Sequence, residues 1–133
     1  MKIREQRGMA AIEFAIVLPV LVSLIFGSIE FSLLLYNQQI ITNASREGAR
    51  FGILMATPRN SANQIRATVE NYCGGHLVSF GADIPPSVDV TGAGGNSGDD
   101  LTVRVTHNYD FLVLSNLGFG PKDLVAQTVM KME

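Results

Sequence analysis

The sequence has almost no cysteine: Cys73 is the only one among 133 residues. A single thiol cannot close a disulfide within the chain, and it has no partner for a cysteine-based metal site. Two roles stay open for Cys73, a buried unreactive side chain or a bridge to another molecule.

The sequence also lacks the short patterns of common catalytic and nucleotide-binding sites. No nucleophile elbow, phosphate-binding loop or paired-histidine zinc motif occurs. His76 and His107 have no third ligand at a recognisable spacing, and the Gly/Asp-rich segment 92–100 does not have the acid pattern of a calcium loop. We therefore expect no enzymatic activity and no catalytic residue, metal, cofactor or small-molecule substrate. The net charge of −2 also argues against a nucleic-acid partner.

Charge is nearly absent from a long segment near the N-terminus. Between Met9 and Tyr36 the only charged side chains are Glu13 and Glu30. As a helix, residues 9–36 would extend for about 42 Å at about 1.5 Å per residue. A bilayer core of about 30 Å requires only about 20 apolar residues. The segment is therefore predicted to cross a membrane once, with Glu30 near the outer interface.

The charges before this segment predict its orientation. Lys2, Arg4 and Arg7 precede the apolar run, and basic flanks favour the cytoplasmic side. A cleaved secretory signal is less consistent with the sequence, because the apolar run exceeds the usual core of about 7–15 residues. No small-x-small cleavage site follows it either. We expect a single-pass protein with a cytoplasmic N-terminus and an extracytoplasmic C-terminal domain.

The junction between the basic start and the apolar run has a distinctive form. Gly8 is followed by the sequence MAAIEF, which places Glu13 fifth after the glycine. This arrangement resembles the type IV pilin superfamily. The resemblance implies a basic leader over residues 1–8 and cleavage by a prepilin peptidase between Gly8 and Met9. It also implies that Glu13 pairs with the α-ammonium of a neighbouring subunit and so sets subunit register.

Physical chemistry gives a reason for such a pairing. A lone carboxylate at the centre of a membrane helix costs about 2.5–3.5 kcal/mol by insertion scales, and less near the interface. A new ammonium at Met9 would lie one helical turn before Glu13, and a helix N-terminus favours an acid in its own right. The alternative is that Glu13 faces lipid headgroups and has no other role.

Further along the helix, the segments IEF, LLYNQQ and NASREGAR resemble the TadE-like proteins of tight-adherence (Tad, or Flp) pilus systems. The resemblance extends over residues 8–56. It implies a minor pilin, pseudopilin or assembly factor in the bacterial inner membrane, acting in pilus biogenesis, adhesion and biofilm formation. The implied partners are the peptidase, other pilin-like subunits and Tad assembly proteins. The alternative is an uncleaved, signal-anchored envelope protein whose small domain binds a ligand or partner.

Beyond the membrane segment 9–36, an amphipathic continuation of the helix is predicted over residues 37–56. Small residues recur there every four positions, at Ala44, Gly48, Gly52 and Ala56. Glycine within a helix costs about 1 kcal/mol relative to alanine, so this stripe predicts close packing, either on the sheet formed by residues 86–133 or on a second subunit.

Residues 57–133 are predicted to form a small α+β domain. Ser61 and Gln64 have the spacing of a capping box, and Gly74 ends the helix that follows. Strands are expected around Val88–Val90, Leu101–Val105 and Leu124–Met132, where apolar and polar residues alternate, with a further short strand over Phe111–Leu114. The long helix packed on a small antiparallel sheet with a second short helix is the pilin-like fold that the resemblance implies.

Overall fold

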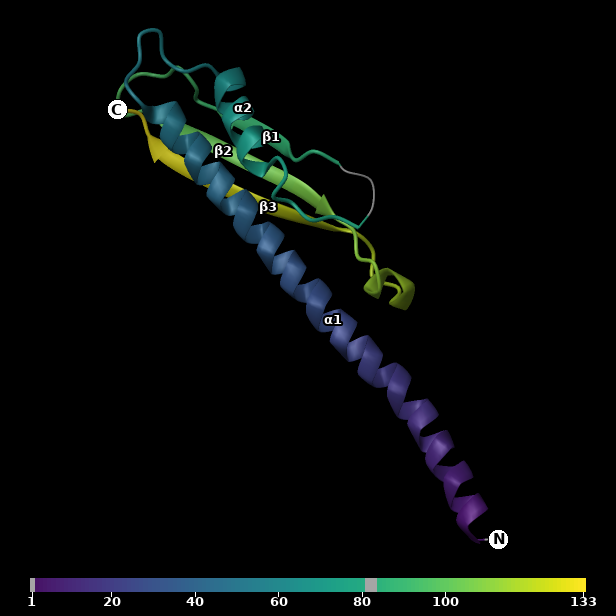
Figure 1. The fold of residues 1–133 in the computed structure, drawn as a ribbon. Coiled ribbons are helices and arrows are strands. Elements are labelled where there is room, and N and C mark those ends of the chain that lie inside the picture. The colour runs from purple at the N-terminus through teal and green to yellow at the C-terminus, as the bar shows by residue number, and fades with distance from the viewer. Residues whose placement is uncertain (1, 81–83) are drawn as a thin grey trace.

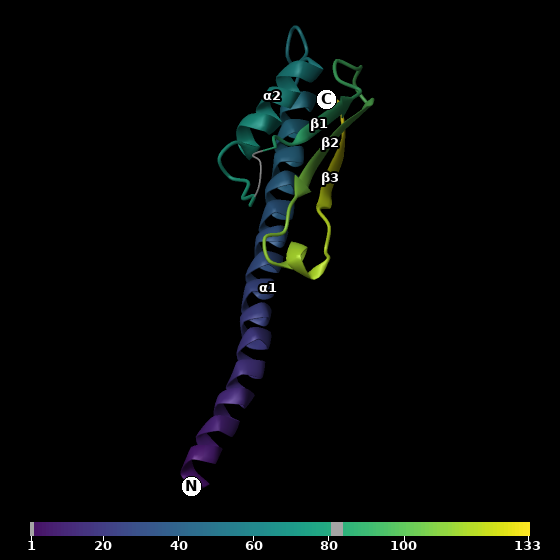
Figure 2. The same cartoon turned by 90° about the vertical axis from the view of Figure 1, so that its right-hand side faces the viewer.

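The computed structural model describes residues 2–80 and 84–133, with side chains described from Gly8 onward. One helix dominates the molecule: α1 runs from Lys2 to Ile53 without interruption, a length of about 78 Å. Its outer half lies along a small domain, and its N-terminal half extends beyond the sheet and the second helix of that domain (Figures 1 and 2). The predicted long helix is confirmed, although it ends three residues before Ala56.

The second helix, α2, comprises Ala62–Cys73 and begins at the predicted capping box. The Ser61 hydroxyl accepts a hydrogen bond from the Gln64 amide at 3.4 Å, and Gln64 Oε1 accepts one from the Ser61 amide at 2.8 Å. These two bonds satisfy donors that a helix start leaves without an intrahelical partner. The buried face of α2 consists of Ile65, Val69 and Cys73.

The sheet is a three-stranded antiparallel meander in the order β1-β2-β3. Its strands are β1 (Ser87–Thr91), β2 (Asp100–Tyr109) and β3 (Lys122–Lys131). The three main predicted strands are confirmed. The short strand predicted over Phe111–Leu114 is wrong, because the backbone amides of Leu112, Val113 and Leu114 bond to a side chain of α1 and not to another strand. A 3-10 turn, η1 (Leu114–Leu117), follows there instead.

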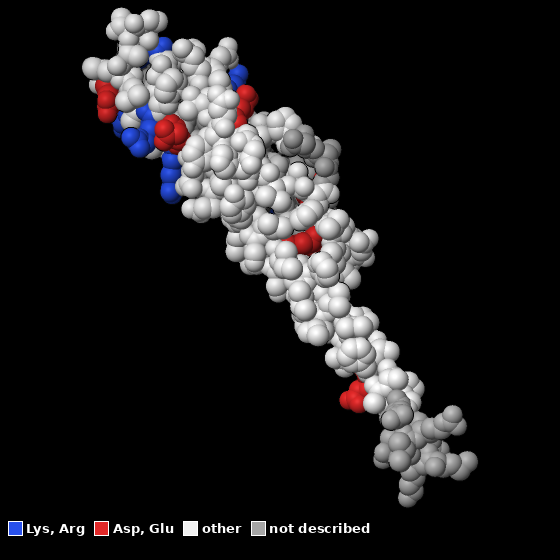
Figure 3. All heavy atoms as spheres, in the orientation of Figure 1, with Lys and Arg blue, Asp and Glu red and all other residues white. Residues whose placement is uncertain are grey.

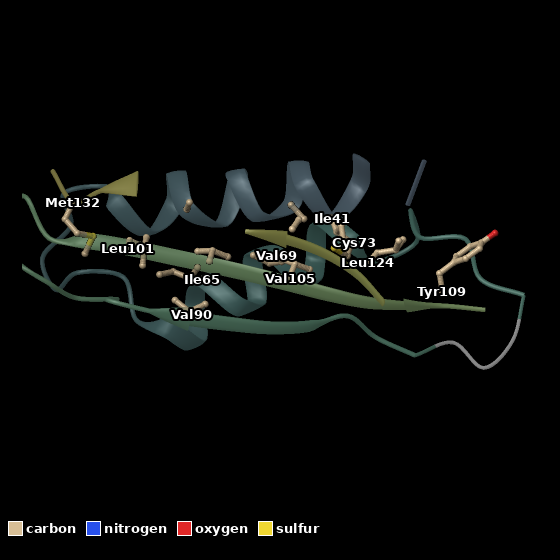
Figure 4. Packing of buried hydrophobic residues seen from close by; sticks show 14 residues of the cluster. Ile41, Ile65, Val69, Cys73, Val90, Leu101, Val105, Tyr109, Leu124 and Met132 are labelled. Carbon is tan, nitrogen blue, oxygen red and sulfur yellow. The ribbon is translucent and has the colours of Figure 1, made fainter. Parts of the chain in front are cut away.

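The hydrophobic core lies between one face of the sheet and the two helices (Figure 4). Alternate residues of β2 point into it, and Leu101, Val103 and Val105 are fully buried. From the helices, Ile41 of α1 and Ile65 of α2 meet the same face. Complete burial of such a side chain contributes about 1.5–3 kcal/mol. The outer half of α1 is therefore part of the domain core.

Candidate functional site: the long helix and its junction with the outer domain

From Gly8 onward, the N-terminal half of α1 is a largely exposed apolar surface. Large side chains there are well exposed, including Met9 at 72% and Leu24 at 64%. In the part of the chain that the structure describes, α1 is the one helix long and apolar enough to cross a membrane, and its most apolar window is not buried. From Gly8 onward, Figure 3 shows little charge on the drawn face of this half, whereas acidic and basic groups gather on the domain.

The predicted processing and register residues all lie on this exposed half. Gly8 belongs to the helix, and a Cβ built on it would have no neighbour within 4 Å. Glu13 is exposed one turn after Met9. Among residues whose side chains are described, Glu13 has no hydrogen-bond or ion-pair partner. The described side chains around Glu13 therefore do not account for the carboxylate.

The three serine side chains of the predicted membrane segment 9–36 are satisfied by the helix itself. Ser23 donates to the Pro19 carbonyl, Ser28 to the Leu24 carbonyl and Ser32 to the Ser28 carbonyl, each at 2.8 Å. The first of these bonds uses the carbonyl of Pro19, the proline inside α1. Internal satisfaction of polar groups is the condition for a helix in a hydrocarbon environment.

Glu30 joins the apolar half of α1 to the outer domain. Its side chain is only 2% exposed. Oε1 accepts hydrogen bonds from the amides of Leu112 and Val113, the latter at 2.8 Å, and Oε2 accepts one from the Leu114 amide at 2.9 Å. Bonds from backbone amides to a carboxylate are among the stronger protein hydrogen bonds. Glu30 thus fixes the chain that follows β2 against the helix.

Sequence reasoning missed this role of Glu30, because its donors lie 82 to 84 residues further along the chain. The only available signal was an acid in an otherwise uncharged segment. Tyr109 lies beside the same junction, where its hydroxyl donates to the Glu30 carbonyl at 3.5 Å. Burial, and then the negative charge of Glu30, raise the pKa of Tyr109.

Three polar side chains further along α1 bind the domain to the helix. The Asn37 amide donates to the Val78 carbonyl at 2.6 Å and accepts from the Val78 amide at 2.9 Å. Gln38 Nε2 donates to the Val125 carbonyl at 3.1 Å. Ser45 Oγ lies 2.7 Å from Thr128 Oγ1. Because Asn37 and Ser45 are fully buried, these bonds fix the rotation of the domain about the helix.

The stripe of small residues packs inside this chain, on both α2 and the sheet. A Cβ on Gly48 would lie 2.4 Å from Val69 Cγ2, and a Cβ on Gly52 would lie 2.4 Å from Leu101 Cδ2. Ala44 is fully buried in the same interface. These glycines therefore let α1 approach α2 and β2 more closely than any side chain would permit.

The prediction that Ala56 continues this stripe is wrong. Ala56 lies beyond the end of α1 and is exposed. The last carbonyls of the helix have tertiary partners: Asn60 Nδ2 donates to the Phe51 carbonyl at 2.6 Å, and the Glu133 amide donates to the Ile53 carbonyl at 3.4 Å. Such partners satisfy acceptors that a helix end leaves unpaired, so the helix stops one turn earlier than its residue pattern predicts.

An apolar groove of about 650 Å³ lies between α1 and η1, near the Glu30 junction. It is lined mainly by the small and apolar residues of one α1 face and by two leucines of η1: Pro19, Ser23, Gly27, Phe31, Leu114 and Leu117. Ser23 and Gly27, which have the spacing of a close helix contact, therefore face an open groove.

Cys73 is in the core of the domain and is only 1% exposed. Burial, and then the nearby negative charge of Glu70, raise the pKa of this thiol to about 11. A thiol with these properties is a poor nucleophile near neutral pH. Of its two candidate roles, the geometry favours the buried, unreactive one.

An exposed apolar helix that continues into the core of a small α+β domain defines a pilin-like membrane protein. More specifically, residues 8–50 match the model of the TadE-like protein family. The resemblance inferred from the sequence is confirmed over this segment, which includes Gly8, Glu13 and Glu30. No curated protein and no solved structure matches the chain. The match indicates a membrane protein related to the Tad pilus.

Proposed function

We propose that this chain is a minor pilin, pseudopilin or assembly factor of a Tad-type pilus. It is held in the bacterial inner membrane by the apolar half of α1, with a cytoplasmic N-terminus and an extracytoplasmic domain. In this role it supports pilus biogenesis, and through the pilus adhesion and biofilm formation. It acts through binding to other subunits and not as an enzyme.

One observation carries the proposal: a single uninterrupted helix is uncovered and apolar at one end and buried in a domain at the other. The segment that matches the TadE-like model includes the uncovered part of the helix from Gly8 onward. A helix of this kind can leave a bilayer and pack among similar helices without refolding, because its domain contacts begin only near Glu30. The three serines bonded within the helix suit either environment.

Processing is the second element of the proposal. Hydrolysis of the Gly8–Met9 peptide bond by a prepilin peptidase would release residues 1–8 and leave an α-ammonium on Met9. A Cβ on Gly8 would have no described neighbour within 4 Å, and Met9 is 72% exposed, so the described residues cover neither of them. Glu13 lacks a partner among the described side chains, which leaves it available to an ammonium of another subunit.

The intact mass of the membrane-bound protein tests this proposal. In cells that contain the peptidase, the expected mass lacks residues 1–8. Gly8→Leu should leave the full-length chain in the membrane. The matched substitution Ala11→Leu, which lies three residues after Gly8 in the same helix, should still be processed. A full-length mass in unmodified cells would overturn the processing proposal.

The alternative function is an uncleaved, signal-anchored envelope protein whose domain binds a ligand or partner. It predicts a full-length mass, normal piliation in cells without the protein, and no cross-link from the apolar half of α1 to a pilin-like subunit. A photo-reactive side chain at Leu21 that cross-links to such a subunit in intact cells would favour the pilus role.

A further inference from the structure

The segment from Phe111 to Pro121, here called the apolar loop, has an unusual surface for an extracytoplasmic connection. It contains no charged residue, although Asp110 and Lys122 flank it. Three of its large apolar side chains are exposed, Leu112 at 51%, Leu117 at 59% and Phe119 at 58%. A cluster of this kind on a soluble surface marks an interaction site.

The apolar loop lies beside the uncovered half of α1 and not beside the polar end of the domain (Figures 1 and 2). Leu114 Cδ2 is 3.9 Å from the position of a Cβ on Gly27. Leu114 and Leu117 line the apolar groove together with α1 residues from Pro19 to Phe31. Leu114 and the exposed Leu117 therefore extend the apolar surface of the helix sideways.

The height of the loop along α1 places it within a bilayer that α1 spans. A hydrocarbon core of about 30 Å corresponds to about 20 residues of helix, which from Met9 extends to Ser28. Gly27, the neighbour of Leu114, lies inside this limit, and the groove continues toward Pro19. If the span extends to Tyr36, the loop lies deeper still.

Most backbone amides between Leu112 and Phe119 have hydrogen-bond partners within the protein. Irregular backbone enters hydrocarbon only when its polar groups are satisfied within the protein. Glu30 accepts the amides of Leu112, Val113 and Leu114. The remaining described bonds are internal to the loop: Asn116 N to Val113 O, Gly118 N to Ser115 O and Phe119 N to Leu114 O, each 3.1 Å. The Ser115 and Asn116 side chains donate to the Leu112 carbonyl at 3.1 and 3.2 Å.

From these observations we propose that the apolar loop inserts into the outer leaflet, with Leu112, Leu117 and Phe119 among the acyl chains. The protein then has two membrane contacts, the span and this loop. Glu30 is the positioning residue, because it holds the loop at this height and accepts the amides of Leu112, Val113 and Leu114. The inference requires that α1 crosses the membrane, but it is independent of the pilus role.

The test uses the full chain in vesicles of phosphatidylethanolamine and phosphatidylglycerol. An environment-sensitive fluorophore is attached to single cysteines introduced by Leu117→Cys and Phe119→Cys in the loop. Leu24→Cys in the span and Met55→Cys beyond the end of α1 are the matched controls, since both are exposed, at 64% and 77%. Cys73 is retained because it is buried, and the unsubstituted chain labelled in parallel corrects for any signal from it.

Quenching by nitroxides on lipid acyl chains is then compared with quenching by iodide in water. We expect loop labels to be quenched by the lipid nitroxides comparably to Leu24→Cys, and several-fold more than Met55→Cys. Adding Glu30→Ala should lower lipid quenching at Phe119→Cys. Quenching of the loop labels by iodide alone would overturn the inference. Protection of these labels from both quenchers would also overturn it, because it would indicate that a second copy of the chain covers the loop. Absence of lipid quenching at Leu24→Cys would show that α1 does not cross the membrane, and the inference about the loop would then fail as well.

Discussion

Gly48 of α1 and Val69 of α2 are in direct contact, so that a Cβ on Gly48 would lie 2.4 Å from Val69 Cγ2. Real side chains do not approach this closely, and Val69 is a stiff β-branched residue at the centre of a fully buried cluster. The glycine therefore sets the distance between the two helices. Its intrinsic helix penalty of about 1 kcal/mol is offset by the burial that this close approach permits.

Gly48→Ala should consequently destabilise the outer domain. Overpacking costs about 1–3 kcal/mol, and the gain in helix propensity recovers only about 1 kcal/mol of it. Gly27→Ala on the same helix is the matched control, because its Cβ would be 3.9 Å from Leu114 Cδ2, an ordinary contact. Thermal unfolding in detergent, followed by near-UV circular dichroism, should show a lower Tm for Gly48→Ala alone. Equal melting of both variants would contradict the packing described.

Glu30→Ala should release the chain after β2 without unfolding the sheet. Each hydrogen bond from an amide to a charged group contributes about 1.5–3 kcal/mol, so amide exchange at Leu112, Val113 and Leu114 should accelerate by about tenfold or more. Hydrogen exchange measured residue by residue would detect this change. Glu47→Ala, which removes an exposed acid of the same helix, should leave these three amides protected. Unchanged exchange in Glu30→Ala would mean that the carboxylate does not hold the loop.

Glu13→Ala should abolish piliation while leaving the protein folded and in the membrane. Glu13 is 17 residues before Glu30, where contacts with the domain begin, and loss of a charge from an apolar segment favours insertion. The isosteric Glu13→Gln should fail equally, because it too removes the charge that an ammonium would pair with. Electron microscopy of pili, with immunoblots of the membrane fraction as the control, gives the result. Normal pili in either variant would exclude a register role.

Alkylation of Cys73 should be slow and should depend steeply on pH. The reactive species is the thiolate, and a pKa raised from 9.0 to about 11 lowers its population at pH 8 by about 100-fold. The native rate should therefore rise about tenfold per pH unit until the pH approaches this pKa, and unfolding in urea should remove the protection. Iodoacetamide labelling followed by mass spectrometry measures both rates. Fast labelling of the native protein at pH 8 would instead favour an accessible thiol suited to an intermolecular bridge.

Much of the fold could be predicted from local patterns. The lack of charge after Arg7 predicted the long apolar helix, the Ser61–Gln64 spacing predicted the start of α2, and strict alternation predicted β2. These features depend on residues close together in the sequence. The predictions also agree with one another, because the outer half of α1, α2 and β2 each contribute apolar residues to the same core.

The features that could not be predicted depend on distant residues. Leu54, Met55 and Ala56 are acceptable in a helix, but α1 ends at Ile53, where Asn60 and Glu133 bind its last carbonyls. The apolar pattern of Phe111–Leu114 is that of a strand, yet its amides face Glu30. Neither outcome has a local signal, because both follow from which segments the fold brings alongside α1.

The continuity of α1 also fixes the distance and the rotation between the two ends of the chain's long helix. In an unbroken helix each residue adds about 1.5 Å of height and about 100° of azimuth. Inserting or deleting one residue between Glu13 and Pro19 would therefore turn and shift the domain relative to the lower end of the helix, and would leave the contacts around Glu30 unchanged. The number of residues between the two acids determines which way the sheet faces when the lower ends of neighbouring helices are aligned.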